Sequence, residues 1–194
     1  PSSGPPSSSA PSDSPAGRTP SDVRARSIFW AGDPDKPKAA LTFDDGPDPR
    51  YTPKVLEILD SYGVKATFFL VGGNAERNPD VVRQIVAKGH VIGNHTYSHK
   101  VVGKLTEEQK IREIERTSEV LSRITGKAPA FFRSPYGYFD TTYFVLADRM
   151  GMTQVMWSVV PEDWTNPGAA VIAKRVLDKS SNGSMTLLRD AGGD

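Results

Sequence analysis

Short apolar runs alternate with longer stretches of helical periodicity from about residue 27 onward. The apolar runs predict buried strands over residues 40–44, 65–71, 90–93, 130–132, 153–157 and 184–188. Apolar residues three and four positions apart predict helices over residues 52–62, 79–88, 105–124, 140–150 and 166–182. This alternation predicts an α/β fold with a parallel sheet and right-handed crossovers, as either a barrel or a doubly wound sheet.

Capping signals mark the starts of three predicted helices. Thr52 comes directly before a proline and is the expected N-cap of the first helix. Thr106 and Gln109 have the spacing of a capping box, in which each side chain bonds the other residue's backbone. Asp140 is the expected N-cap of the helix that follows the 130–132 strand.

Composition distinguishes an N-terminal segment from the rest of the chain and argues against several classes of function. Residues 1–26 are rich in Pro, Ser and Gly and predict a disordered linker, which leaves residues 27–194 as one domain. The net charge of +1 favours neither a nucleic-acid nor an anionic-membrane partner. The chain has no cysteine, so it can form neither a disulfide nor a thiolate metal site. No apolar run approaches the roughly 20 residues that a membrane span needs.

Two adjacent carboxylates, Asp44 and Asp45, stand where the first strand runs into Gly46 and Pro47. Neighbouring residues of a strand point to opposite faces, so the two acids need a bend in the backbone to serve one site. The Gly-Pro turn can supply that bend. Such a pair can also be no more than two solvated acids at the end of a strand.

His95 and His99 lie four residues apart, directly after the third predicted strand. A helical or tightly turned backbone would bring both imidazoles to the same side of this segment. His pairs with this spacing of four residues bind zinc on helices. Two His with one carboxylate form a known catalytic metal site with open positions. One Asp could then be the ligand, and the other could take a proton from a water that the ion activates. The alternative is a pair of His with a purely structural role.

Three motifs together resemble the polysaccharide deacetylases of carbohydrate esterase family 4, the NodB-homology domain. They are Thr42-Phe43-Asp44-Asp45-Gly46, His95-Thr96-Tyr97-Ser98-His99 and Arg133-Ser134-Pro135-Tyr136. The resemblance implies a distorted (β/α) barrel, here expected to lack its last helix and strand. It also implies metal-dependent removal of acetyl groups from N- or O-acetylated sugars.

The resemblance also assigns roles to individual residues. Asp44 matches the catalytic base and Arg133 the arginine that pairs with it, although a surface arginine is the plain alternative for the latter. The implied metal ligands are Asp45, His95 and His99. The remaining matches are the groove wall at Pro135 and Tyr136, the orienting carboxylate Asp163, and the acetyl pocket at Trp164 and Leu187.

The chain departs from the family at Arg189, which stands where the family has a general-acid histidine. A guanidinium group stays protonated above about pH 12, so it cannot deliver a proton during turnover. It can still pair with Asp163 and offer positive charge. We therefore expect reduced activity, most of all on N-acetyl substrates, with Asp44 as a slower acid.

These expectations lead to two hypotheses of different classes. The first is a deacetylase dependent on a divalent metal, with zinc favoured over cobalt or nickel, in the extracellular or cell-wall space of a bacterium. Its partner would be acetylated chitooligosaccharide, peptidoglycan or xylan, and its expected state is a monomer that could associate through an open C-terminal sheet edge. The second is a catalytically silent carbohydrate-binding domain that keeps the metal site.

Overall fold

The computed structural model describes residues 28–192, and the predicted 1–26 linker lies outside this range. Six parallel strands form one sheet in the order β5-β4-β3-β2-β1-β6. Their bounds are Ala40–Asp44 for β1, Thr67–Leu70 for β2, Val91–Asn94 for β3, Phe131–Phe132 for β4, Thr153–Gln154 for β5 and Met185–Arg189 for β6. The predicted parallel α/β fold is confirmed, with β4 and β5 shorter than the sequence pattern suggested.

The sheet curls into a distorted barrel, which decides between the two architectures left open by periodicity. The chain beyond β5 reaches the outer edge of β6, where Val159 pairs with Thr186. The amide of Leu187 donates to the Val159 carbonyl at 3.0 Å, and the amide of Val159 donates to the Met185 carbonyl at 3.1 Å. The β6 edge that we expected to be open is therefore partly paired, which weakens the physical reason for association through it.

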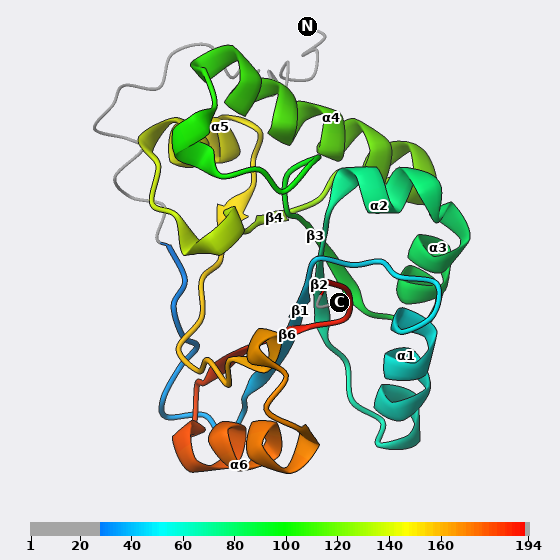
Figure 1. The fold of residues 1–194 in the computed structure, drawn as a ribbon, viewed down its shortest axis with the longest axis vertical. Coiled ribbons are helices and arrows are strands. Elements are labelled where there is room, and N and C mark those ends of the chain that lie inside the picture. Colours follow the sequence, from blue (N-terminus) through cyan, green and yellow to red (C-terminus); the bar gives the residue numbers. More distant parts are fainter. Residues whose placement is uncertain (1–27, 193–194) are drawn as a thin grey trace, which may run out of the picture.

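Six helices cover the sheet in the described part of the chain. They are α1 Thr52–Ser61, α2 Gly72–Arg77, α3 Pro79–Ala87, α4 Glu107–Thr125, α5 Thr141–Arg149 and α6 Ala169–Lys179. Figure 1 shows α1, α3, α2 and α4 following one another along one side of the strands, with α6 lying apart from them. Between residues 28 and 192, no helix has the length and apolar character needed to cross a membrane.

Two of the three predicted caps are confirmed. The Thr106 hydroxyl accepts from the Gln109 amide, and the Gln109 side chain accepts from the Thr106 amide, which completes the capping box at the start of α4. The Asp140 carboxylate accepts from the Tyr143 amide at 3.0 Å and caps α5. Because these signals involve residues at most three positions apart, the sequence alone was enough to identify them.

The third cap is wrong, because Thr52 lies inside the first turn of α1. Its hydroxyl accepts from the Asp48 amide at 2.9 Å and donates to the Asp190 carboxylate at 2.6 Å. The glycine pair that follows the predicted 65–71 strand begins the short helix α2, which the sequence pattern did not predict. Thr52 therefore joins the start of α1 to the chain that follows β6.

The core lies between the sheet and the helices α1 to α4. Phe43, Phe68 and Leu70 of the strands pack with Leu56, Ile85 and Leu121 of the helices. A second apolar cluster joins Phe132 of β4 to Tyr143 and Ala147 of α5. These clusters fix the strands, so the loops at their carboxyl ends project from a rigid support.

Candidate active site

The residues expected to take part in the chemistry lie together at the carboxyl ends of the strands. Asp44 ends β1 and Arg189 ends β6, and these two residues are paired in register. His95 follows β3, and Arg133 follows β4. Parallel strands bring these ends to one edge of the sheet, and Figure 1 shows β1, β2, β3 and β6 running side by side to it.

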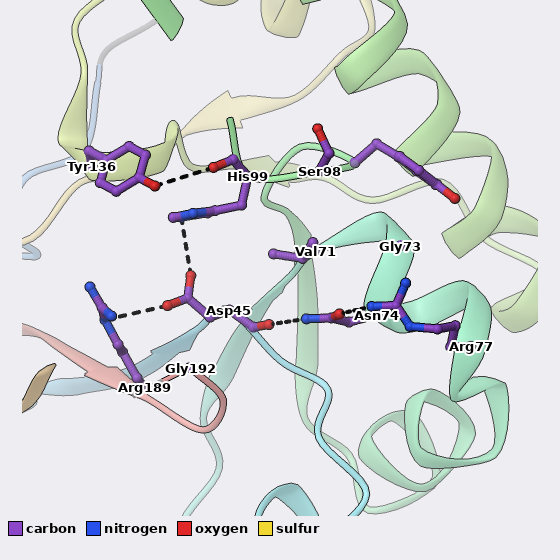
Figure 2. Close-up of a pocket in the computed structure, with 11 residues that line it drawn as sticks. Asp45, Val71, Gly73, Asn74, Arg77, Ser98, His99, Tyr136, Arg189 and Gly192 are labelled. Atoms are coloured by element: carbon purple, nitrogen blue, oxygen red, sulfur yellow. Dashed lines mark hydrogen bonds and ion pairs between the residues drawn. The ribbon is translucent and has the colours of Figure 1, made fainter. Parts of the chain in front are cut away.

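The predicted bend at the acid pair is present. Asp45 has a φ of 74°, a left-handed conformation that turns the chain directly after the strand. The Asn74 side chain of α2 donates to the Asp45 carbonyl at 2.7 Å and holds the turned backbone (Figure 2). The two carboxylates can therefore face one site while making different contacts.

Asp45, His95 and His99 form a compact set of candidate metal ligands. One carboxylate oxygen of Asp45 lies 3.5 Å from His95 Nε2 and 3.2 Å from His99 Nε2. One ligand atom from each residue can be chosen so that all lie within 4.8 Å of one another. The other ring nitrogen of His95, Nδ1, donates to the Arg133 carbonyl at 2.7 Å, so Nε2 faces Asp45 and is the nitrogen that can bind an ion once it carries no proton. Two imidazoles and one carboxylate suit a divalent transition metal.

An irregular loop, rather than a helix, places the two His on one side. Thr96 and His99 have φ values of 66° and 52°, and the two His rings stand 4.9 Å apart. Glu113 of α4 accepts from the backbone amides of Tyr97 and Ser98 at 2.8 and 2.7 Å. It also accepts from the Ser98 hydroxyl at 2.6 Å. Glu113 is a part of the site that sequence reasoning missed, because a Glu on a charged helix gives no sign of such a contact.

Burial and neighbouring charges shift the ligands' pKa values in different directions. Burial alone would raise the pKa of Asp45, but the hydrogen bond and charge of His95, with the charges of His99 and Arg189, hold that pKa below its ordinary range. Burial and the nearby His95 lower the pKa of His99 to about 4. Asp45 is therefore ionised and His99 neutral at pH 7, as metal ligation requires. Burial alone would lower the pKa of His95, but the charge of Asp44 and the hydrogen bond and charge of Asp45 outweigh it and raise that pKa, so His95 must give up a proton when an ion binds.

Arg133 is fully buried, so the surface-arginine alternative is wrong. Its guanidinium donates to Asp44 and to the Thr42 hydroxyl, each at 2.7 Å. It also donates to the carbonyls of Val155 at 3.1 Å and Met156 at 2.8 Å. These bonds hold one oxygen of the buried Asp44 carboxylate, while the other lies 3.7 Å from His95 Nε2.

The side chain of Arg189 points toward the candidate metal ligand Asp45 and does not form the expected pair with Asp163. Its Nε lies 3.4 Å from the second oxygen of Asp45, and its guanidinium stands 5.0 Å from the centre of the Trp164 ring. Asp163 accepts from the backbone amide of Arg189 at 2.7 Å. Burial raises the pKa of Asp163 even though this amide and the Arg189 charge favour its ionised form.

Two cavities open beside the candidate ligands. The first, of about 370 Å³, is lined by Trp157, Trp164 and Leu187 together with Asp44 and His95. The second, of about 500 Å³, extends over α2 and the loop of His99. Asp45, His99, Tyr136 and Arg189 line both cavities.

The expected groove wall is only half present. Tyr136 is exposed, its hydroxyl donates to the His99 carbonyl at 3.4 Å, and its ring stands 4.7 Å from the His99 ring. Pro135 is buried and lines neither cavity; it begins the short Pro135–Gly137 turn. Pro135 therefore shapes the backbone that presents Tyr136, and the exposed wall is the tyrosine.

The sequence model of the family described as polysaccharide deacetylase matches residues 31–155. The chain belongs to this family. A peptidoglycan-N-acetylglucosamine deacetylase of Bacillus cereus is 43% identical over 171 residues, which are 88% of this chain and 62% of the relative. A chitooligosaccharide deacetylase of Sinorhizobium fredii is 36% identical, over 79% of this chain and 72% of the relative. The chain thus spans less than two thirds of the length of the Bacillus cereus relative.

Solved structures of polysaccharide deacetylases share the fold. A peptidoglycan N-acetylglucosamine deacetylase in complex with 4-naphthalen-1-yl-N-oxidanyl-benzamide has a TM-score of 0.84 at 42% identity, covering 91% of this chain and 83% of that one. A CE4 family pseudoenzyme from Bacillus anthracis has a TM-score of 0.82 at 29% identity, covering 89% of this chain and 61% of that one. The expected distorted barrel and family are therefore confirmed.

In this member of the polysaccharide deacetylase family, a further contact packs against the turn that follows the acid pair. A Cβ atom added to Gly46 would lie 2.5 Å from either carboxylate oxygen of Asp190, so only glycine fits. Asp190 is buried, and its amide donates to the Asp44 carbonyl at 3.3 Å. Because Thr52 also binds Asp190, this acid joins α1, β6 and the loop of Asp45.

The first prediction concerns the pH dependence of stability through Asp190. Burial raises the pKa of Asp190 from 3.8 to about 7, so the folded state keeps a proton that the unfolded chain releases between these values. The stability contributed by this group is complete below about pH 4 and is lost as pH rises through 7, by up to roughly 4 kcal/mol. Asp190→Asn should therefore gain stability relative to the parent chain between pH 4 and 7, measured by urea unfolding.

Exposed Asp178, which pairs with Lys174, provides the matched control. Asp178→Asn should give a stability difference from the parent that stays nearly constant over this pH range. A constant difference for Asp190→Asn as well would contradict the raised pKa of Asp190.

The second prediction concerns Glu113. Glu113→Ala removes the acceptor of three hydrogen bonds to the ligand loop and should weaken zinc binding about 10- to 100-fold, as loss of support around metal ligands commonly does. Competition with a chromophoric chelator measures this affinity. Glu119→Ala, on the exposed face of the same helix, should bind zinc as the parent does. Equal affinities in both variants, each folded by circular dichroism, would show that Glu113 does not hold the loop.

Proposed function

We propose that this domain hydrolyses acetyl groups of a peptidoglycan or chitooligosaccharide strand in the cell-wall space. One observation carries the proposal: the Asp45, His95 and His99 ligand atoms lie together beside the buried Asp44–Arg133 pair and open into a cavity. The donor set fits a divalent metal, and we propose zinc. The family's metal-dependent chemistry and the substrates named for the relatives agree with this assignment.

The residues divide the first chemical step between them. A divalent ion held by the three ligands would supply a Lewis acid that polarises the acetyl carbonyl and lowers the pKa of a water molecule. Asp44 is the general base that accepts the water proton, while Arg133 holds one of its carboxylate oxygens by a hydrogen bond and leaves the other free to act. Trp157, Trp164 and Leu187 enclose the acetyl methyl group. The backbone N–H of Tyr136 donates to the developing oxyanion.

The second step needs an acid, and this chain departs from the family there. The bond between the acetyl carbon and the sugar nitrogen breaks, and the leaving nitrogen must receive a proton as acetate is released. Arg189 cannot donate a proton at neutral pH. Asp44, protonated in the first step, is the group available to return the proton, so this site should turn over slowly.

Acetate release in the presence and absence of a chelator tests the proposed function. The metal-loaded protein should release acetate from N-acetylchitotetraose or from peptidoglycan fragments, and both Asp45→Ala and chelation should reduce the rate to background. Elemental analysis of the protein identifies the ion. Acetate release that survives the substitution and the chelator would overturn the metal assignment.

A further prediction concerns Arg189 and the missing acid. Arg189→His restores a group that can donate a proton near pH 7 and should raise acetate release by about 10²–10⁴-fold. Arg189→Gln is the matched control, since it removes the positive charge without supplying an acid. An equal increase in both variants would mean that the guanidinium charge, and not the missing acid, limits turnover.

A carbohydrate-binding domain without catalysis is the second candidate, favoured by Arg189 and by the similarity to a pseudoenzyme. It predicts that neither the parent nor Arg189→His releases acetate from any of these sugars, although both bind them. Calorimetric titration with N-acetylchitotetraose, beside the acetate assay, separates this candidate from the deacetylase.

A further inference from the structure

The 500 Å³ cavity adjoins the 370 Å³ cavity that contains Asp44 and His95, which is called the catalytic cavity below. The two share Asp45, His99, Tyr136 and Arg189 as a common boundary. Its size lies within the range of about 300–1,000 Å³ typical of ligand pockets. An acetamido group in the catalytic cavity would place neighbouring substituents of the sugar strand at the boundary of this second cavity.

The lining of the second cavity carries more positive than negative charge. The guanidinium groups of Arg77 and Arg189 lie on opposite sides of it, while Asp45 is its single lining carboxylate (Figure 2). Asp45 already faces Arg189 at 3.4 Å and the two candidate His ligands. The charge of Arg77 is therefore not balanced by the cavity wall.

Arg77 differs from neighbouring arginines in its partners. Arg116 and Arg123 pair with Glu76, and Arg83 pairs with Asp80. Arg77 forms no ion pair with any residue between 28 and 192, and its guanidinium donates to the neutral side-chain oxygen of Asn74. An exposed cation held in place without a carboxylate partner can bind an anion without first breaking an ion pair.

Asn74 connects this cation to the catalytic centre. Its amide nitrogen donates to the Asp45 carbonyl at 2.7 Å, and its oxygen accepts from Arg77. Figure 2 shows the three residues as a continuous chain along the cavity, with Arg189 on its far side. The guanidinium of Arg77 therefore has a set position relative to the metal ligands, as recognition of a substituent near the reacting group requires.

We propose that the second cavity binds a carboxylate carried by the sugar strand next to the reacting acetamide, with Arg77 as the residue that recognises it. This inference rests on the proposed deacetylase function and narrows its substrate. A peptidoglycan strand carries such carboxylates on its stem peptides, or on the lactyl ether groups to which no peptide is attached, whereas a chitooligosaccharide is neutral. Arg77 thus selects peptidoglycan over chitooligosaccharide by charge.

Three tetrasaccharides of equal length test this selection. One alternates N-acetylglucosamine with N-acetylmuramic acid and has free lactyl carboxylates; the second is its methyl ester; the third is N-acetylchitotetraose. The parent protein should bind and deacetylate the acid form best. Arg77→Gln should raise KM and Kd for the acid form about 3- to 10-fold and leave both values for the ester and the chitotetraose unchanged.

Arg83→Gln provides the matched control, because Arg83 is exposed on the next helix and does not line the cavity. It should leave all three substrates unaffected. Raising NaCl from 50 to 500 mM should weaken the parent's preference for the acid form, but not its binding of the ester.

The outcomes separate this inference from the proposed function. Equal affinity of the parent for the acid and ester forms, or an equal effect of Arg77→Gln on all three sugars, would overturn the carboxylate site. Absence of acetate release from every sugar, also with Arg189→His, would overturn the deacetylase proposal instead. In that case, calorimetric Kd values for the acid and ester forms still decide whether Arg77 recognises the carboxylate.

Discussion

The site depends on a fully buried guanidinium group. Removing a charge of this kind from water costs several kcal/mol, and the cost is offset only where its donors find partners. Arg133 places four of its five N–H groups on partners: the Asp44 carboxylate, the Thr42 hydroxyl and two carbonyls of the chain that follows β5. Its own carbonyl faces His95 Nδ1. One residue thus sets the orientation of the base and the tautomer of a metal ligand, and ties β1 to the chain beyond β5.

The Asp45 carboxylate contacts both the candidate His ligands and the Arg189 guanidinium. One of its oxygens faces the two imidazoles and the other faces Arg189, so this carboxylate is shared between the candidate ion site and a guanidinium group. A carboxylate that also binds a guanidinium group offers less negative charge to an ion. Arg189 therefore affects the proposed chemistry twice: it removes the acid from the second step and weakens the ligand field in the first.

The sequence predicted the features that depend on near neighbours. The strand that ends in Asp44, the capping box at Thr106 and the bend after the acid pair all follow from residues a few positions apart. The resemblance supplied the pairing of Asp44 with Arg133, 89 positions away, which no local pattern contains. Periodicity does not report strand order, so the barrel follows only from the resemblance and from the pairing of Val159 with β6.

Other parts of the site could not be predicted, since they depend on contacts between distant segments. Thr52 has the sequence signature of an N-cap, yet its hydroxyl binds Asp190, 138 positions away. Glu113 reaches a loop 15 and 16 positions earlier in the chain, and nothing in its helix distinguishes it from the exposed Glu119. In each case a tertiary hydrogen bond outweighs local propensity, which is a weak preference worth less than about 1 kcal/mol per residue.

Arg189 takes part in both proposals for this domain, the slow second step of deacetylation and the binding of a carboxylate on the sugar strand. Its guanidinium lines both cavities, so the charge that cannot serve as an acid on one side remains available to an anion on the other. A histidine at this position would be largely neutral at pH 7 and would add little attraction for a carboxylate. Slow proton return and charge-based recognition of the strand are therefore two consequences of the same residue. On this view, restoring the acid should increase turnover and at the same time reduce the preference for a carboxylate-bearing strand, with Arg77 left as its remaining cation.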